Sequence, residues 1–275
     1  MTKPARSTTT PGCIQLAQQA GVARVTISHP PRFNAMSRIM WRELRTVFEG
    51  VQNSTDIRCV VVLGDRGNFC SGGDISEYAD FRFQESSLRD FHENDVWGGL
   101  QAMLACDVPI VAQIEGNCMG AGLEMASCCD IRLAGSSAKF GAPIARLGFP
   151  MAPREAALVA REAGLPTARQ MLLEAAIFSA ADMKARGFLS QVLPDAELAA
   201  QAQAAALRIV ALAPQAARLN KQTIRVLNSP LALVEHAHKA IDSIAIQIDN
   251  AYAYADSTEH REGILAFLEK RKPAF

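Results

Sequence analysis

Residues 109–134 read PIVAQIEGNCMGAGLEMASCCDIRLA, and the order of their patterns decides the fold. The apolar run 109–114 has the length of a buried strand. A glycine-rich loop follows over 115–122, and small and apolar residues at 123–129 predict a helix. A further strand is predicted over 130–134. This succession of strand, glycine loop, helix and strand is typical of an α/β or mixed α+β fold.

The chain before this stretch shows the same kinds of pattern. Residues 13–28 predict two short strands around a turn at Gly21, and residues 38–52 predict a helix with Ser37 as its N-cap. Residues 57–64 predict a buried strand that enters a second glycine-rich loop over 64–74. The polar stretch 77–94 is interpreted as a mobile segment. From about residue 154 onward the Ala-rich sequence predicts helices.

Composition excludes several classes of protein. The 275 residues are 49% hydrophobic, and 28 basic side chains balance 28 acidic ones, so no bulk charge attracts nucleic acid or an anionic membrane. No apolar run approaches the roughly 18 residues that a membrane helix needs. Residues 1–12 lack the apolar core of a secretory signal and predict a disordered lead-in. Seven cysteines without metal-type spacing predict buried free thiols in a reducing cytoplasm.

Two glycine loops, 70–74 and 119–124, are candidates for chemistry. Neither matches the glycine spacing of dinucleotide-binding or phosphate-binding loops, and each alone is also consistent with a purely structural turn. Each loop precedes a predicted helix, however, where free backbone N–H groups stabilise an anion. N–H groups from both loops that meet at one oxygen would form an oxyanion hole.

Glu124 lies inside the second loop's helix, in an otherwise apolar run. It either favours the helix N-terminus or, if desolvated, transfers protons near neutral pH. The five histidines have no spacing typical of a metal site or a catalytic triad. Arg154, Glu155 and the basic residues 270–272 are interpreted as solvated charges.

Five segments occur in an order that resembles the crotonase (enoyl-CoA hydratase/isomerase) superfamily. The resemblance covers nearly the whole chain and implies a spiral of ββα units over residues 13–205, with two roughly perpendicular sheets. It also implies that C-terminal helices over 206–275 build a homotrimer or a dimer of trimers. The segments are ISHPPRFNAMS, GNFCSGGDISEY, PIVAQIEGNCMGAGLEMASCCDIRLA, AKFGAPIARLGF and HREGILAFLEKRKPAF.

The resemblance implies an acyl-CoA substrate, no metal, and no cofactor beyond the coenzyme A moiety of that substrate. The oxyanion donors of the family match Gly73 and Ala121, and its proton-transfer carboxylate matches Glu124. Alanine at 121 replaces the usual glycine but keeps the N–H. A neighbouring subunit adds an aromatic ring and a lysine, which match Phe267 and Lys270. The remaining coenzyme A contacts match Arg32, Phe33, Ala35, Ser71, Gly72, Asp74, Ile75 and Met119.

One position departs from the family pattern. Its hydratases carry a second glutamate in an F-G-x-P-E run, where this chain has FGAPI and ends on Ile144. Family isomerases place their single base at the same position. No substitute is evident in the sequence, although His92 and Arg146 are candidates that also have simple structural explanations.

The apolar side chain of Ile144 predicts weak hydration of a 2-enoyl-CoA, and a gain in hydration for Ile144→Glu. Three readings therefore stay open. The chain is a hydratase or isomerase, it catalyses a decarboxylation, thioester hydrolysis or lyase reaction on the same fold, or it is a non-catalytic scaffold that binds coenzyme A.

Overall fold

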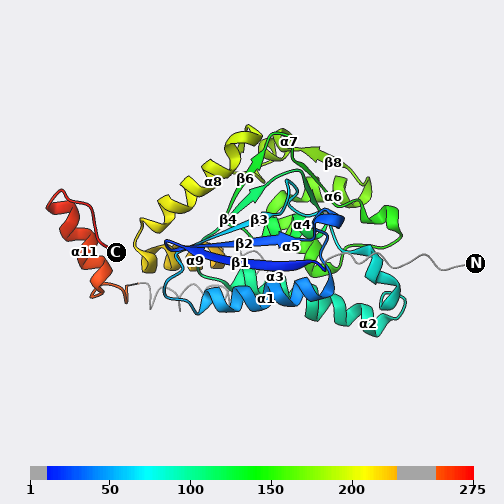
Figure 1. The fold of residues 1–275 in the computed structure, drawn as a ribbon, viewed down its shortest axis with the longest axis horizontal. Coiled ribbons are helices and arrows are strands. Elements are labelled where there is room, and N and C mark those ends of the chain that lie inside the picture. Colours follow the sequence, from blue (N-terminus) through cyan, green and yellow to red (C-terminus); the bar gives the residue numbers. More distant parts are fainter. Residues whose placement is uncertain (1–10, 228–251) are drawn as a thin grey trace, which may run out of the picture.

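A computed structural model describes residues 11–227 and 252–275 of the chain. Its larger sheet has six strands in the order β1-β2-β3-β4-β6-β9 (Figure 1). β1 and β2 form an antiparallel hairpin, and every later pair in this sheet is parallel. The strands are β1 (Cys13–Gln19), β2 (Val22–Ser28), β3 (Cys59–Gly64), β4 (Ile110–Ile114), β6 (Ile131–Gly135) and β9 (Gln191–Leu193).

The smaller sheet has three strands in the order β5-β7-β8 and lies where the glycine loops meet. β5 (Asn117–Met119) pairs in parallel with β7 (Lys139–Gly141), which pairs antiparallel with β8 (Ile177–Ser179). β5 leads through Gly120 into α4 (Ala121–Ser127). The small sheet therefore fixes the point at which α4 begins.

Helices cover both faces of the larger sheet. Successive side chains of a strand point to opposite faces. In β3, Val60 and Val62 belong to the core that α1 (Arg38–Gln52) and α3 (Trp97–Ala105) complete. Cys59 and Val61 belong to a second core under α8 (Asp195–Val210). Burial on both faces explains why β3 reads as a continuous apolar run rather than as an alternating one.

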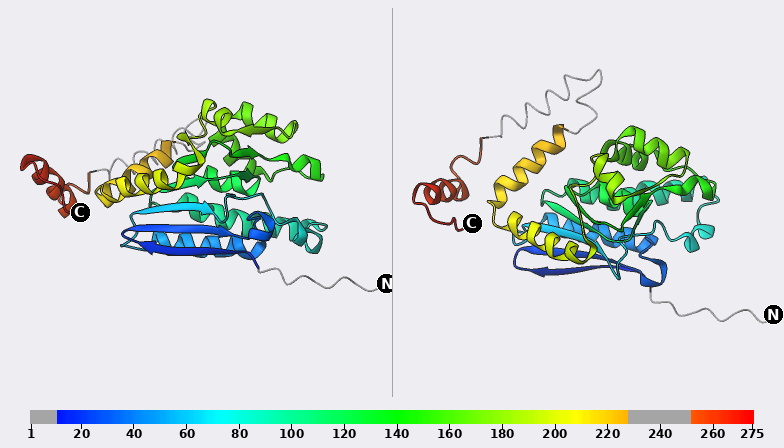
Figure 2. Two further views of the ribbon diagram at one scale, coloured as in Figure 1. Left: turned by 45° about the horizontal axis from the view of Figure 1, so that its top comes forward. Right: turned by 90° about the horizontal axis from the view of Figure 1, so that it is seen from above.

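The remaining helices surround this centre. Figure 2 shows α11 (red) beyond α8 (yellow), at the end of the molecule opposite to α2. No helix among residues 11–227 and 252–275 is long and apolar enough to cross a membrane. These helices are α2 (Glu85–Asp90), α5 (Pro153–Ala163), α6 (Leu165–Leu173), α7 (Ala180–Ala185), α9 (Pro214–Leu227) and α11 (Thr258–Leu268).

The structure confirms the predicted α/β class and most early elements. The two strands around Gly21 and the helix over 38–52 are present, and the Ser37 hydroxyl oxygen accepts a hydrogen bond from the Met40 N–H at 3.3 Å. α8 continues across residue 205, where the spiral core is predicted to end, and that division stays a prediction. Residues 1–10 of the predicted lead-in and 228–251 of the C-terminal region lie outside the described residues.

The sequence predicted no helix over 77–94, but the structure has helices there. The segment contains most of the short helix η2 (Ile75–Asp80), all of α2, and the start of the π-helical turn η3 (Phe91–Val96). Its aromatic rings pack on one another, with centroids 5.8 Å apart for Tyr78 and Phe81 and 4.6 Å apart for Phe81 and Phe91. The mostly polar composition of the segment did not indicate these packed aromatic rings, because only one face of the segment is buried. The sequence also missed β8 and β9, which are three-residue strands inside a helical region.

All seven cysteines are free thiols, and six of them are buried, as their apolar surroundings predict. The exception, Cys13, is half-buried at the start of β1. Among the described residues, no group of three or more His, Cys, Asp and Glu side chains has a geometry that could hold a metal ion.

Candidate active site

The two glycine loops predicted from the sequence lie directly against each other. The Cys70 N–H donates to the Asn117 carbonyl at 2.8 Å, and the Met119 N–H donates to the Cys70 carbonyl at 2.9 Å. Gly120 has a φ of 46°, a left-handed conformation that glycine adopts without strain. A Cβ atom added at Gly122 would lie 2.7 Å from the Cys70 carbonyl oxygen. Glycine at 120 and 122 therefore permits the close contact between the loops.

A cavity of about 360 Å³ opens where the loops meet. It gathers both predicted oxyanion donors, the predicted proton-transfer group and the apolar residue that departs from the family pattern. His92 and Arg146, the two weaker candidates, also line it. The predicted site residues in its wall are Ser71, Gly72, Gly73, Ile75, Met119, Ala121, Glu124 and Ile144.

Two backbone N–H groups in this wall are available to a bound oxygen. Ala121 is the first residue of α4, and Gly73 lies in the loop that contacts the start of that helix. Within the described part of the chain, neither N–H donates a hydrogen bond to another group. A pair of donors of this kind suits a carbonyl oxygen that becomes negatively charged during a reaction.

Glu124 lies in the first turn of α4, a helix in which every residue is buried. Its side chain is only 5% exposed, and no described residue donates a hydrogen bond to its carboxyl group. Burial raises its pKa well above the ordinary value, and the charge of Glu155 raises it further. Glu124 therefore retains a proton at a pH where most glutamates are ionised.

Four of the predicted coenzyme A contacts lie beside the cavity rather than in its wall. Arg32, Phe33 and Ala35 belong to a loop that is hydrogen-bonded to the first glycine loop. The Ser71 hydroxyl donates to the Arg32 carbonyl at 2.9 Å, and Arg32 pairs with Asp74 at 3.4 Å. The guanidinium of Arg32 and the ring of Phe33 are substantially exposed, so this loop offers a surface continuous with the cavity.

Phe267 and Lys270 are not brought to the cavity. Phe267 lies on α11 and is 82% exposed, and Lys270 lies just beyond the end of that helix. α11 lies far from α4 and α5, which contribute residues to the cavity wall (Figure 1). A contact of these two residues with coenzyme A would need a neighbouring subunit, and it stays a prediction.

The interpretation of Glu155 as a solvated charge is wrong. Its side chain is 4% exposed, lines the cavity, and lies 2.7 Å from His92 Nδ1. The preceding residue, Arg154, is exposed and pairs with Glu93 at 3.1 Å, as a solvated charge does. The sequence held one signal: Glu155 precedes Leu158 and Val159 by three and four residues, which places all three on one helix face.

Sequence reasoning also missed Tyr78 and Arg82. A Cβ atom added at Gly73 would collide with the Tyr78 hydroxyl, so this hydroxyl lies directly against the first predicted oxyanion donor. Burial raises the pKa of Tyr78 to about 12, and the hydroxyl therefore stays protonated as a donor. Arg82 lies over the rings of Tyr78 and Phe149, with its guanidinium carbon 4.5 and 3.9 Å from their centroids.

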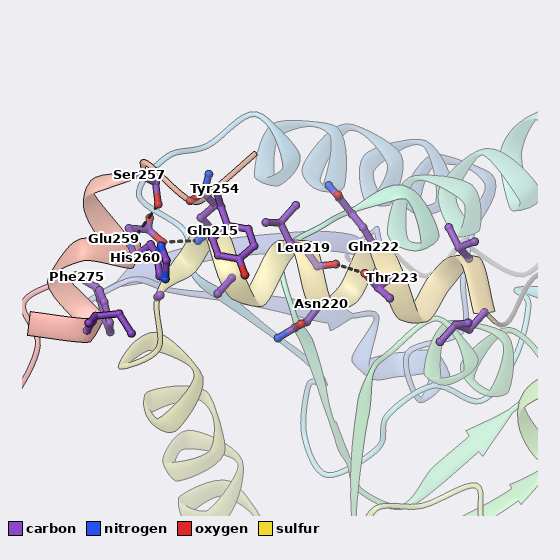
Figure 3. A pocket seen from close by; sticks show the side chains of 16 residues that line it. Gln215, Leu219, Asn220, Gln222, Thr223, Tyr254, Ser257, Glu259, His260 and Phe275 are labelled. Atoms are coloured by element: carbon purple, nitrogen blue, oxygen red, sulfur yellow. Dashed lines mark hydrogen bonds between the residues drawn. The ribbon is translucent and has the colours of Figure 1, made fainter. Parts of the chain in front are cut away.

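A larger cavity of about 570 Å³ lies between α9 and α11 (Figure 3). Glu259 accepts a hydrogen bond from the Gln215 N–H at 2.8 Å there, and most of the remaining lining is apolar. None of the predicted catalytic residues lines it. Its two helices belong to the region that is predicted to form contacts between subunits.

Comparisons with known proteins place these observations in a family. Residues 17–275 match the family model described as enoyl-CoA hydratase/isomerase. The chain is 28% identical over 263 residues to the "Probable enoyl-CoA hydratase" of Mycobacterium bovis, covering 95% of this chain and 96% of the relative. It is 29% identical over 259 residues to the short-chain-enoyl-CoA hydratase of Clostridium acetobutylicum, covering 94% and 95%. A crystal structure of an enoyl-CoA hydratase/carnithine racemase from Magnetospirillum magneticum matches with a TM-score of 0.88 and 35% identity, covering 97% and 96%.

Proposed function

Because this chain belongs to the enoyl-CoA hydratase/isomerase family, we propose that it binds an acyl-CoA thioester and stabilises its enolate, with hydration of a 2-enoyl-CoA as the reaction. One observation carries this proposal. A single cavity gathers the N–H groups of Gly73 and Ala121, which donate to no described residue, and the buried carboxyl group of Glu124.

In this proposal the thioester carbonyl oxygen accepts hydrogen bonds from the N–H groups of Gly73 and Ala121. These bonds strengthen as the oxygen gains enolate charge, and each donor contributes about 10²–10³ in rate in known cases. Glu124 exchanges a proton with Cα of the acyl group. Its raised pKa suits proton transfer near neutral pH.

The coenzyme A moiety would lie along the loop that contains Arg32 and Phe33, with Phe267 and Lys270 of a second copy completing the site. This arrangement requires the trimer or hexamer that the family resemblance implies, in a cytoplasmic protein. Light scattering tests the assembly, and a monomer at micromolar concentration would contradict both the trimer and the shared coenzyme A site.

Ile144 favours a second candidate function. Its apolar side chain lines the cavity at the position where the family's hydratases carry a glutamate. A chain without that carboxylate would suit a non-catalytic scaffold that binds coenzyme A, or a decarboxylase, thioester hydrolase or lyase.

An assay with crotonyl-CoA, run beside calorimetric titration with coenzyme A, separates these candidates. Hydration of crotonyl-CoA supports the proposed function. Turnover of another acyl-CoA without hydration supports one of the other reactions. Tight binding of coenzyme A without turnover across a panel of acyl-CoA thioesters supports the scaffold.

A further inference from the structure

Hydration of a carbon–carbon double bond requires two proton transfers. A base takes a proton from the water that attacks Cβ, and an acid delivers a proton to Cα. Ile144 performs neither step, because its side chain has no proton donor or acceptor. Glu124 alone would have to do both. A second side chain that can transfer a proton would therefore have to lie among the residues that line the cavity.

Glu155 is the second carboxylate in this wall. It lies in the first turn of α5, which packs against α4, and both Glu155 and Glu124 line the same cavity. Its side chain is 4% exposed, so it is as deeply buried as Glu124. A pair of carboxylates in one small cavity is typical of sites in which one group holds a proton and the other does not.

His92 distinguishes the two carboxylates. It lies on the π-helical turn η3, and its Nδ1 is 2.7 Å from Glu155 Oε1, while its Nε2 is 3.4 Å from Arg82 Nη1. Because a guanidinium only donates, these partners assign Nε2 as acceptor and Nδ1–H as donor to Glu155. A hydrogen bond of this kind favours the ionised carboxylate. Glu124 receives no such bond from any described residue, and its burial favours the protonated form.

We propose that Glu155, positioned by His92, is the base that activates water in this chain, and that Glu124 is the acid that protonates Cα. The inference rests on the proposed function and deepens it. Glu155 stands in a different element from the missing glutamate, because Ile144 lies in the short helix η4 (Pro143–Leu147) and Glu155 lies in α5.

Glu155 takes one proton from water as the oxygen forms a bond to Cβ, and the π electrons move to the thioester as an enolate. Glu124 gives its proton to Cα, and the electrons return to the new Cα–H bond. The product is a 3-hydroxyacyl-CoA. A proton then passes from Glu155 to Glu124, directly or through solvent, and the original state is restored.

The charges around Glu155 fit this role. His92 and Arg82 approach it from the segment before α3, Tyr78 from η2, and Glu124 from α4. Arg146 also lines the cavity, while Arg154 is paired with Glu93 outside it. Among the described residues, Arg82 and Arg146 are the cations in the cavity wall, so a single ionised carboxylate is not left without compensating charge.

Glu155→Gln tests the proposal. Glutamine keeps the size of the side chain and an oxygen that accepts from His92, but it does not take a proton from water. We expect the rate of crotonyl-CoA hydration to fall by about 10²–10⁴, with KM little changed. Deuterium incorporation at Cα of butyryl-CoA in D₂O should persist, because there the ionised form of Glu124 takes the Cα proton and no water attacks Cβ. Glu93→Gln is the matched control, since this exposed carboxylate belongs to the neighbouring ion pair.

The possible results separate the two proposals. Unchanged hydration in Glu155→Gln overturns this inference and leaves the proposed function intact. Equal losses of hydration and of deuterium incorporation also overturn it, because a purely structural role affects both. If the unmodified protein hydrates no 2-enoyl-CoA, the proposed function fails, and the inference fails with it.

His92 supplies a second test that does not depend on the folding of Glu155→Gln. His92→Leu removes the donor to Glu155, so the acid limb of kcat/KM for hydration should move to higher pH. His92→Asn, whose amide nitrogen can replace Nδ1 as donor, should restore the profile. An identical pH profile in the unmodified protein and His92→Leu would overturn the positioning role.

Discussion

α4 and α5 both begin at the active-site cavity, and each carries a buried glutamate in its first turn. Their surroundings differ. Every residue of α4 is buried, and its start is fixed by the backbone contact between two glycine loops. α5 buries only one face, and the residues before and after Glu155 include the exposed Pro153, Arg154 and Ala157.

The difference shows two ways to desolvate a carboxylate. Around Glu124 the local sequence is sufficient, because small and apolar neighbours exclude water. The surroundings of Glu155 depend instead on a residue distant in the chain, because its hydrogen-bond partner His92 lies 63 residues away. A buried carboxyl group that receives no hydrogen bond favours its protonated form and suits the role of acid. A buried carboxylate that accepts a hydrogen bond favours its ionised form and suits the role of base. The contrast between the helices is thus also the proposed division of acid and base.

The largest expected effect is on Glu124. Glu124→Gln should lower turnover of crotonyl-CoA by about 10²–10⁴, because the amide cannot deliver a proton to Cα. It should leave the calorimetric affinity for coenzyme A unchanged. In contrast to Glu155→Gln, it should also abolish deuterium incorporation at Cα of butyryl-CoA. An unaltered rate would mean that Glu124 only favours the start of its helix.

The next prediction concerns Ile144, which lines the cavity with both glutamates. From the sequence alone, Ile144→Glu is expected to improve hydration. With Glu155 in the cavity, we expect a gain of about tenfold only in the Glu155→Gln background, where the new carboxylate replaces a missing base. In the unmodified protein it adds a like charge and should give no gain. Measured rates for the four combinations check this, and equal gains in both backgrounds would exclude a role for Glu155.

The sequence was sufficient to predict what local pattern determines. The glycine loops, the buried strand over 57–64 and the start of α4 depend on residues that are neighbours in the chain. The burial of Glu124 also follows from its immediate neighbours. These features agree with the structure because short-range sterics and hydrophobicity decide them.

The burial of Glu155 was not predicted, because it depends mainly on contacts with residues that are distant in the chain. Glu155 stands next to Arg154 and near further charged residues, a pattern typical of solvated side chains. Only the spacing to Leu158 and Val159 indicated that Glu155 is buried. The aromatic residues that hold the segment before α3 are likewise spaced among polar ones. His92 reaches Glu155 only after that segment has folded against α5.

A change in the packing of α4 tests the contact between the loops. Alanine forms helices better than glycine, yet Gly122→Ala should destabilise the protein by about 1–3 kcal/mol, since the added Cβ would collide with the Cys70 carbonyl. Urea denaturation measures this loss. The control is Ala157→Ser on the exposed face of α5, which should change the free energy of unfolding by no more than about 0.5 kcal/mol. Equal effects would contradict the difference in burial between the two helices.

The smallest effect is on stability as a function of pH. Burial raises the pKa of Glu124 in the folded state, so the folded protein binds a proton there more tightly than the unfolded chain does. The stability that this proton provides is complete below the pKa of an unfolded glutamate, and it is lost as the pH rises through the raised value.

Glutamine is neutral at every pH. The Tm of Glu124→Gln should therefore equal that of the unmodified protein at about pH 4 and exceed it increasingly toward about pH 8. Thermal melts of Glu124→Gln and of the unmodified protein across this range measure the difference, and parallel curves would contradict a raised pKa of Glu124 in the folded state.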